Sequence, residues 1–145
     1  MAFKIEQPKR KEEKAFEVKS ERKTQSEMFR MNNAGQEYNG WTNYTTWGVA
    51  LNIDSEQGLQ EEIYTQIKEG NINNGDELKD YFKQTLEDSG NYNEDYNAYK
   101  LSDAWTEREL QSDVNWYEIY ETYKRNIKEE EEYQKKHGRK FLINL

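Results

Sequence analysis

Large apolar residues recur every three or four positions through the middle of the chain, with polar and charged residues between them. This spacing gathers apolar side chains on one face of a helix. Tyr44, Trp47 and Leu51 form the first such face, and their spacing favours burial against the rest of the domain. The pattern predicts five helices, over about 43–54, 56–69, 76–88, 103–112 and from 116 onward.

Capping residues stand where these segments begin and end. A short polar side chain can accept a hydrogen bond from a free N–H of the first helical turn, and glycine readily follows the last turn. The predicted caps are Thr42 or Asn43, Ser55, Ser102 and Asn115 at helix starts, with Gly70 and Gly138 as stops. Together they predict a mainly helical protein, a small bundle of about five helices.

The stretch 38–47 holds two of the four tryptophans. Asn39 and Gly40 predict a tight turn, because both tolerate positive φ. Trp41, Tyr44 and Trp47 follow, and a cluster of large rings can stack a base or grip a peptide. Buried rings also anchor the core of small domains, and this second interpretation is favoured here.

Two strings carry a resemblance to a known family: NGWTNYTTWGVALNID near the start of the patterned region, and VNWYEI at 114–119. The chain resembles a family of small, uncharacterised proteins of phages, plasmids and bacterial genomes over about 38–123. Gly48 departs from the family pattern, which has a large aliphatic residue there. The resemblance implies a mobile-element setting and a small helical domain, with no assigned chemistry. The residues that carry it are Asn39, Gly40, Trp41, Asn43, Tyr44, Trp47 and Trp116.

Residues 89–100 combine three tyrosines with Ser, Gly, Asn, Asp and Glu. Such a composition is typical of binding loops, in which rigid rings offer contact area at low entropic cost. It equally fits an ordinary long surface loop with a ring or two against the core, so both interpretations stay open. Tyr92 and Tyr96 are the candidate contact residues.

Composition limits the size of the core. Hydrophobic residues make up 33% of the 145 residues and charged residues 34%, and the mean hydropathy is −1.34. We expect a core domain over 38–127, a charged N-terminal arm over 1–37 with a helix at about 20–31, and a charged helix extension with a tail over 128–145. The apolar residues 141–145 are expected to pair with 3–5, to fold onto the core or to form a dimer contact.

Charge is divided unevenly along the chain. Residues 38–123 hold five Lys and Arg against eighteen Asp and Glu, a net charge of −13, whereas 1–30 and 124–145 each carry +3. An acidic body attracts basic protein surfaces, although solubility alone also explains it. The candidate partner-binding residues combine these acidic residues with the two loop tyrosines: Glu61, Glu62, Asp80, Glu87, Asp88, Tyr92, Glu94, Asp95, Tyr96, Asp103, Glu107 and Asp113.

Residues that commonly carry catalysis are scarce. There is no cysteine, and the only histidine, His137, stands in a basic tail without a convincing serine and aspartate partner. Neither a phosphate-binding glycine loop nor an EF-hand occurs. We expect no enzyme, no cofactor and no metal. Neither a signal peptide nor an apolar run long enough for the membrane is apparent, so we expect a cytoplasmic protein.

Three functions from different classes follow. The first is an inhibitor of a host nucleic-acid-handling defence complex, such as a CRISPR or restriction effector, whose groove binds the acidic body in place of a phosphate backbone. The second is a nucleic-acid-binding accessory protein that uses its basic ends and stacks bases on the Trp and Tyr rings. The third is a structural module that forms homo-oligomers. The sequence favours the first, with a basic protein as partner and direct nucleic-acid binding as the weaker alternative.

Overall fold

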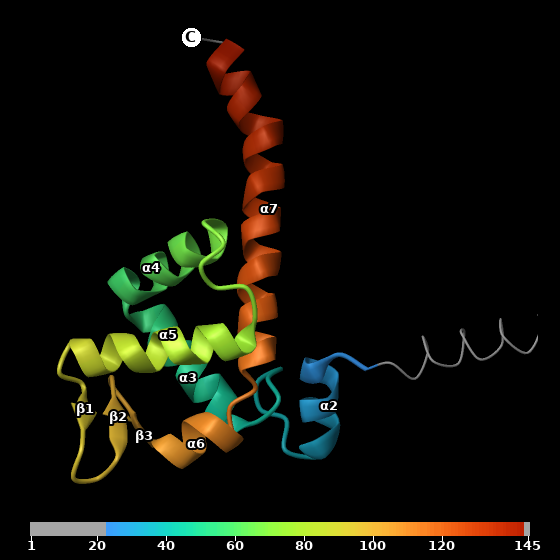
Figure 1. Ribbon diagram of the computed structural model, residues 1–145. Coiled ribbons are helices and arrows are strands. Elements are labelled where there is room, and N and C mark those ends of the chain that lie inside the picture. Colours follow the sequence, from blue (N-terminus) through green and yellow to red (C-terminus); the bar gives the residue numbers. More distant parts are fainter. Residues whose placement is uncertain (1–22, 144–145) are drawn as a thin grey trace, which may run out of the picture.

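A long C-terminal helix crosses a body of shorter helices and a small sheet (Figure 1). The structure is a computed structural model that describes residues 23–143, with side chains as far as Gly138. The helices are α2 (Gln25–Asn32), α3 (Tyr44–Ser55), α4 (Gln57–Lys68), α5 (Gly75–Asp88), α6 (Glu107–Ser112) and α7 (Trp116–Ile143). The strands are β1 (Tyr92–Asn93), β2 (Ala98–Lys100) and β3 (Ala104–Thr106). The prediction of a mainly helical protein is confirmed.

Helix α7 is the element on which the others pack. Its 28 residues span about 42 Å at 1.5 Å per residue. Its first half lies against α5, α4, α3 and α2, and its second half projects away from the body (Figure 1). Ile127 is its last buried residue among the side chains described. The described structure therefore consists of a packed body and a projecting helical rod.

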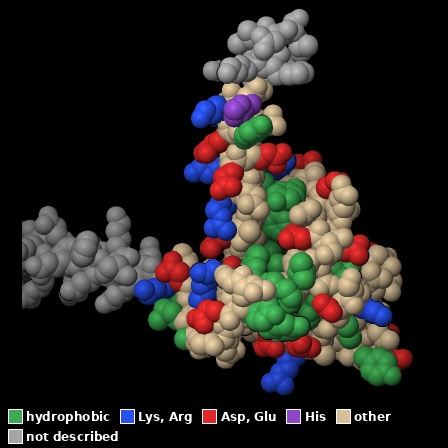
Figure 2. Space-filling model, turned by 180° about the vertical axis from the view of Figure 1, so that it is seen from behind, with side chains coloured by type: hydrophobic (Ala, Val, Ile, Leu, Met, Phe, Trp, Pro, Cys, Tyr) green, Lys and Arg blue, Asp and Glu red, His purple; other side chains and the backbone are tan. Residues whose placement is uncertain are grey.

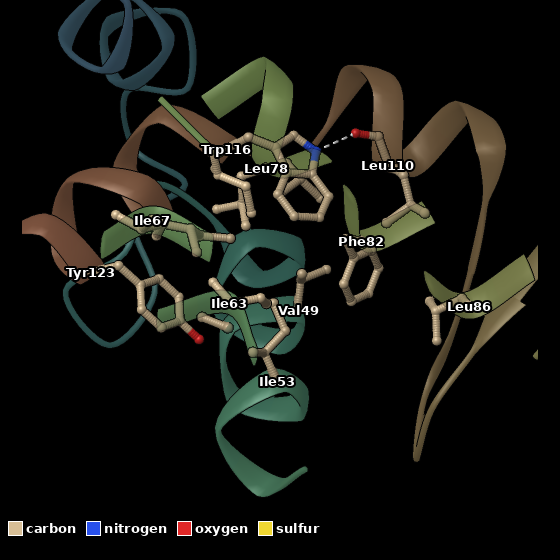
Figure 3. Close-up of a cluster of buried hydrophobic side chains, with 14 of the residues drawn as sticks. Val49, Ile53, Ile63, Ile67, Leu78, Phe82, Leu86, Leu110, Trp116 and Tyr123 are labelled. Carbon is tan, nitrogen blue, oxygen red and sulfur yellow. Dashed lines mark hydrogen bonds between the residues drawn. The ribbon is translucent and has the colours of Figure 1, made fainter. Parts of the chain in front are cut away.

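The core lies between α3, α4, α5 and the first half of α7 (Figure 3). Phe82 stands near its centre, with its ring centroid 5.2 Å from that of Trp116 and 6.2 Å from that of Trp105. The Trp116 indole donates a hydrogen bond of 2.7 Å to the backbone oxygen of Leu110, so the buried ring leaves no polar atom unpaired. The chain has few hydrophobic residues, and many of them are thus concentrated around the rings of Phe82, Trp105 and Trp116.

Several predicted helix ends are confirmed. Asn43 caps α3 by accepting from the N–H of Thr46 at 2.8 Å, and Asn115 accepts from the N–H of Glu118 at 3.2 Å at the start of α7. Gly70 follows α4 with a φ of 81°, as a glycine C-cap requires. The turn at Asn39–Gly40 is also present, with φ of 47° and 84°.

Other predicted ends are wrong. Ser55 belongs to α3, and its hydroxyl donates to the Leu51 backbone oxygen instead of capping α4. Thr106, not Ser102, caps α6 through a reciprocal pair with Glu109. Helix α7 continues through Gly138, because a glycine with helical neighbours costs only about 1 kcal/mol and need not end a helix.

The segment expected as a loop and the first turn of the fourth helix form an antiparallel sheet in the order β1-β2-β3. Tyr99 on β2 pairs with Tyr92 on one side and with Trp105 on the other, so these three rings share one face. That face lies toward α5, which buries Tyr99 and Trp105. The strands are two or three residues long, too short for their alternation to stand out in the sequence.

Parts of the sequence expectations fall outside the described residues. These are the arm over 1–22 and the partners of the apolar end, because residues 144–145 and the side chains from 139 onward are not described. Over 23–143, none of the helices combines the length and the apolar character that crossing a membrane requires.

Candidate functional site

The segment 39–54 and the segment 114–119, which hold the two sequence strings quoted above, meet in a buried polar network. The Asn115 side-chain amide donates to the Thr42 hydroxyl at 2.8 Å, and its backbone N–H donates to the Thr46 hydroxyl at 2.9 Å. Glu118 accepts from the backbone N–H of Thr42 at 2.9 Å. All four residues are buried. A fully paired network of this kind fixes how two elements dock, so the motif has a structural role here.

Helix α2 completes the network from the N-terminal side. The Arg30 guanidinium pairs with the buried Glu118 carboxylate, and the Ser26 backbone oxygen accepts from the Asn115 amide at 3.2 Å. Asn43 bridges further, donating to Asn33 at 3.1 Å and to the Asp113 backbone oxygen at 2.8 Å. The expected helix near 20–31 is therefore present as α2, and it is anchored to the body.

Three rings of the 38–47 stretch form a cluster at the surface. The ring centroid of Tyr38 lies 4.8 Å from that of Trp47 and 5.0 Å from that of Tyr44, and the Tyr44 and Trp47 centroids lie 5.4 Å apart. Tyr38 is 38% exposed and Tyr44 63% exposed, while Trp47 is half-buried. The interpretation of these rings as core anchors is wrong for Tyr44, and the expected apolar face also fails at Leu51, which is 45% exposed.

The reason is a rotation of the buried face of α3. Val49, Ala50 and Ile53 point to the core, together with the polar residues Thr46 and Asn52 that bond to neighbouring segments. A helix that buries polar residues in a network leaves some of its large apolar residues outside. On the face away from α5, where α3 lies, hydrophobic side chains gather at the centre of the body with acidic ones around them (Figure 2).

Gly48 lies next to this ring cluster and leaves a hollow. A cavity of about 230 Å³ is lined by Tyr44, Thr45, Gly48, Asp103, Ala104, Trp105 and Glu109. An added Cβ at Gly48 would meet no atom within 4 Å. Gly48 therefore leaves space beside the exposed rings that a larger side chain would fill.

The β1–β2 hairpin displays the two candidate tyrosines differently. Tyr92 packs its ring 4.6 Å from that of Tyr99 and donates from its hydroxyl to Asn97 at 2.7 Å. Tyr96 at the hairpin tip is 77% exposed, beside the exposed Glu94 and Asp95. An open concavity of about 780 Å³ lies along the hairpin, and its lining includes the small residues Ala98 and Ala104. The hairpin thus exposes one ring and two carboxylates at its tip.

The candidate acidic residues do not form one cluster. They are spread over α4 (Glu61, Glu62), α5 (Asp80, Glu87, Asp88), the hairpin (Glu94, Asp95) and the segments around α6 (Asp103, Glu107, Asp113). Six of them take part in side-chain contacts within the fold, two of which, Gln57–Glu61 and Gln84–Asp88, are hydrogen bonds between side chains one helical turn apart. Glu62 and Glu87 accept from the hydroxyls of Tyr81 and Tyr99, Asp103 accepts from Asn52, and Glu107 pairs with Lys83.

The structure brings Glu87 and Glu107 together around the hydroxyl of Tyr99. Burial and the two carboxylates raise the pKa of Tyr99 far above its usual range. For Glu107, burial acts to raise the pKa, but hydrogen bonds from Lys83 and Tyr99 and the nearby ammonium outweigh it, so the pKa is lowered. Glu107 therefore stays ionised, and its charge is matched by Lys83 within the fold.

Most carboxylates nevertheless remain exposed to solvent. Over 38–123, every acidic residue except Glu107, Glu109 and Glu118 is exposed. Of the few basic residues in this range, Lys79 is half-buried and donates to Gln111 at 3.0 Å, and Lys83 pairs with Glu107. The body therefore presents a surface of dispersed negative charge with little positive charge to offset it.

Sequence reasoning missed Tyr38 as a site residue. The bridge between Tyr38 and Trp41 across the Asn39–Gly40 turn carries its ring to the α3 surface. The available signal was the turn itself, because a tight turn returns the chain on which Tyr38 stands toward the helix that follows.

The comparisons with known proteins add no relative. The chain matches no family model, no curated protein and no solved structure. Within residues 23–143, no three histidine, cysteine or acidic side chains gather closely enough to hold a metal ion. The family resemblance therefore stays a prediction that rests on the two strings quoted above.

Proposed function

We propose that this protein is a non-catalytic binding protein that inhibits a nucleic-acid-handling defence complex, of the restriction or CRISPR type, through its acidic surface. The observation that carries the proposal is the exposure of nearly all carboxylates over 38–123 on a body whose lysines 79 and 83 are engaged internally. A basic groove that binds nucleic acid attracts such a surface over long distances.

The rigidity of the body supports the same function. The buried network of Thr42, Asn115 and Glu118 fixes α2, α3 and α7 relative to one another. The backbone that carries many of the acidic side chains is therefore held in one arrangement before binding, so a partner that engages them orders few additional backbone segments. The resemblance to proteins of phages and plasmids is the ground for the defence setting, and a cytoplasmic location follows from that setting.

The test is affinity capture from a host lysate. The tagged protein is incubated with lysate at low and at high salt, with and without nuclease treatment, and the captured proteins are identified by mass spectrometry. We expect a basic nuclease or CRISPR effector that stays bound after nuclease treatment and is released by salt, because attraction between exposed charges is screened.

A charge-reversed pair makes the test specific. Glu94→Lys with Asp95→Lys reverses two exposed charges at the hairpin tip, and Glu129→Lys with Glu130→Lys makes the same change on the projecting part of α7. Capture is expected to fall with the hairpin pair and to change little with the helix pair. Equal capture by both variants would remove the hairpin from the mechanism, and capture of no basic protein would reject the function.

The exposed ring cluster supports a second candidate function. Tyr38, Tyr44 and Trp47 form an accessible aromatic surface, and successive bases stack on such rings in proteins that bind single strands. In the same experiment this function predicts recovery of nucleic acid, and loss of the captured material after nuclease treatment. If the captured complex contains no other protein and has twice the mass of the monomer, the result would instead indicate a homo-oligomeric module.

A further inference from the structure

A small pocket lies between α3, α4 and the first half of α7. Its volume is about 100 Å³. The floor is buried, the walls are half-buried, and the rim is exposed, so the pocket opens to solvent on one side. The floor is Ala50, Ile119 and Tyr123, the walls are Trp41, Gln60, Tyr64 and Thr122, and the rim is Asp54 and Asn126.

The floor of the pocket contains an unpaired polar atom. Tyr123 is only 5% exposed, and its hydroxyl has no hydrogen-bond partner among the described residues. Leaving a buried hydroxyl unpaired is unfavourable, and folded proteins rarely tolerate this without a partner or a functional reason. The Tyr123 ring itself is held firmly, because its centroid lies 4.7 Å from that of Tyr64 in an edge-to-face arrangement.

The rim adds a carboxylate that the fold only partly satisfies. Asp54 accepts one hydrogen bond, from the Gln60 side-chain amide at 3.1 Å, and no lysine or arginine among the described residues pairs with it. Burial raises the pKa of Asp54, and the Gln60 hydrogen bond lowers it only in part. The pKa of Tyr123 is raised by burial, by the charge of Asp54 and by Tyr64, so these groups lie near one another.

Three aromatic rings and one carboxylate define the chemistry that the pocket recognises. A cation is attracted both to the faces of tryptophan and tyrosine rings and to a carboxylate. A guanidinium group suits this setting better than an ammonium group, because it is flat, weakly hydrated and able to donate several hydrogen bonds in one plane. At about 30 Å³ per water molecule, the pocket holds about three waters, which is room for one guanidinium group.

We propose that this pocket binds an arginine side chain of the protein partner, with the guanidinium group between the rings of Trp41 and Tyr64 and its N–H groups donating to Asp54 and the Tyr123 hydroxyl. The inference rests on the proposed function, because a basic nucleic-acid-binding partner supplies the arginine. It also adds to that function, since dispersed charge attracts many basic proteins, whereas a shaped pocket selects one side chain.

The test uses the full-length ¹⁵N-labelled protein and a short acetylated, amidated peptide with one arginine among glycines and serines. The indole N–H signal of Trp41 is assigned with a Trp41→Phe variant and followed by NMR during the titration. We expect saturable movement of this signal, with an affinity at least about tenfold weaker for the same peptide carrying neutral citrulline, since the charge-assisted contact is lost. A lysine peptide is expected to bind more weakly than the arginine peptide.

Matched variants separate the two polar contacts. Asp54→Asn keeps the shape of the rim and removes its charge. This variant is expected to bind the arginine peptide with about tenfold lower affinity. Tyr123→Phe removes only the unpaired hydroxyl, and it is expected to weaken binding several-fold without lowering the stability of the free protein. Asp88→Asn, an equally conservative change on α5 outside the pocket, is the control and should leave the affinity unchanged.

Several outcomes would overturn the inference. If the Trp41 signal does not shift during the titration, the pocket holds only water. If the citrulline peptide binds as tightly as the arginine peptide, the pocket does not recognise the positive charge. An unchanged affinity in Asp54→Asn or Tyr123→Phe would remove that residue from the site. If the arginine peptide does not bind while the hairpin variant still lowers effector capture, only the proposed role of the pocket is rejected. If the peptide binds while no basic protein is captured, only the proposed function is rejected.

Discussion

Two helical glycines in this protein have opposite environments, so replacing each with alanine is expected to have opposite effects on stability. A Cβ added at Gly75 would lie 2.6 Å from the Tyr117 backbone nitrogen and 2.8 Å from the Trp116 backbone carbon, where α5 begins against α7. A Cβ added at Gly48 would meet nothing within 4 Å. The first glycine permits a close approach of two helices, and the second leaves a hollow unfilled.

Gly75→Ala is expected to lower the free energy of unfolding by about 1–3 kcal/mol, because backbone atoms must move to admit the methyl group. Gly48→Ala is expected to raise it by roughly 0.5–1 kcal/mol, because alanine loses less backbone entropy in a helix. Urea unfolding followed by circular dichroism measures both. Destabilisation by Gly48→Ala would show that the hollow beside Tyr44 is needed for the fold, and a neutral Gly75→Ala would show that α5 and α7 are packed less closely.

At the scale of elements, an ion pair between α5 and α6 should make stability depend on pH. The pKa of Glu107 is lowered because hydrogen bonds and charge from Lys83, with a hydrogen bond from Tyr99, outweigh burial. A carboxyl whose pKa is lower in the folded state contributes stability above its unfolded pKa, about 4.3, and loses that contribution as the pH falls through the folded pKa. The pair should therefore stabilise the protein at pH 6 and stop doing so in stronger acid.

Glu107→Gln tests this dependence. The variant is expected to be less stable than the wild type at pH 6, and the difference should shrink as the pH falls below about 4. Urea midpoints measured at several pH values report it. Glu94→Gln at the exposed hairpin tip is the control. It shows how the same substitution at an exposed position changes the urea midpoint. A difference between Glu107→Gln and the wild type that stays constant over the whole range would contradict the assignment.

The elements differ in how far the sequence predicts them, and the reason is local. Asn43 and Asn115 stand before long periodic segments, so their capping roles were predictable from neighbours alone. The sequence does not predict the sheet, because β2 and β3 have three residues each and the pairing of the Tyr99 ring with that of Trp105 depends on α5 covering them. Tertiary packing, not local propensity, decides such strands.

The candidate site was less predictable than the fold. The acidic character of the body is visible in the composition, but its exposed side chains are mixed with others, such as Asp103 and Glu107, that serve the fold. The rotation of α3 that exposes Tyr44 follows from the buried bonds of Thr46 and Asn52 with residues more than fifty positions away. No spacing rule within the helix carries that information.

The whole molecule has an excess of negative charge on its body, and this has two consequences of opposite sign. Residues 38–123 carry a net charge of −13, and few cations lie among the exposed carboxylates. Mutual repulsion opposes folding to a compact body, whereas attraction to a basic partner favours binding. Salt screens both effects, as the Debye length falls from about 30 Å at 0.01 M to about 8 Å at 0.15 M.

Added sodium chloride is therefore expected to strengthen folding and weaken binding over the same range. Between about 0.01 M and 0.15 M, the urea midpoint should rise because repulsion is screened, while capture of the basic partner should fall because attraction is screened. Near pH 4.9, where the charges of the whole chain sum to zero, the rise in the midpoint should be smaller because protonation has removed part of the negative charge of the body. A midpoint that falls with salt at pH 7 would mean that ion pairs such as Arg30–Glu118 outweigh the repulsion. The exposed carboxylates would then cost the fold little, and the body would be under less electrostatic strain than its charge implies.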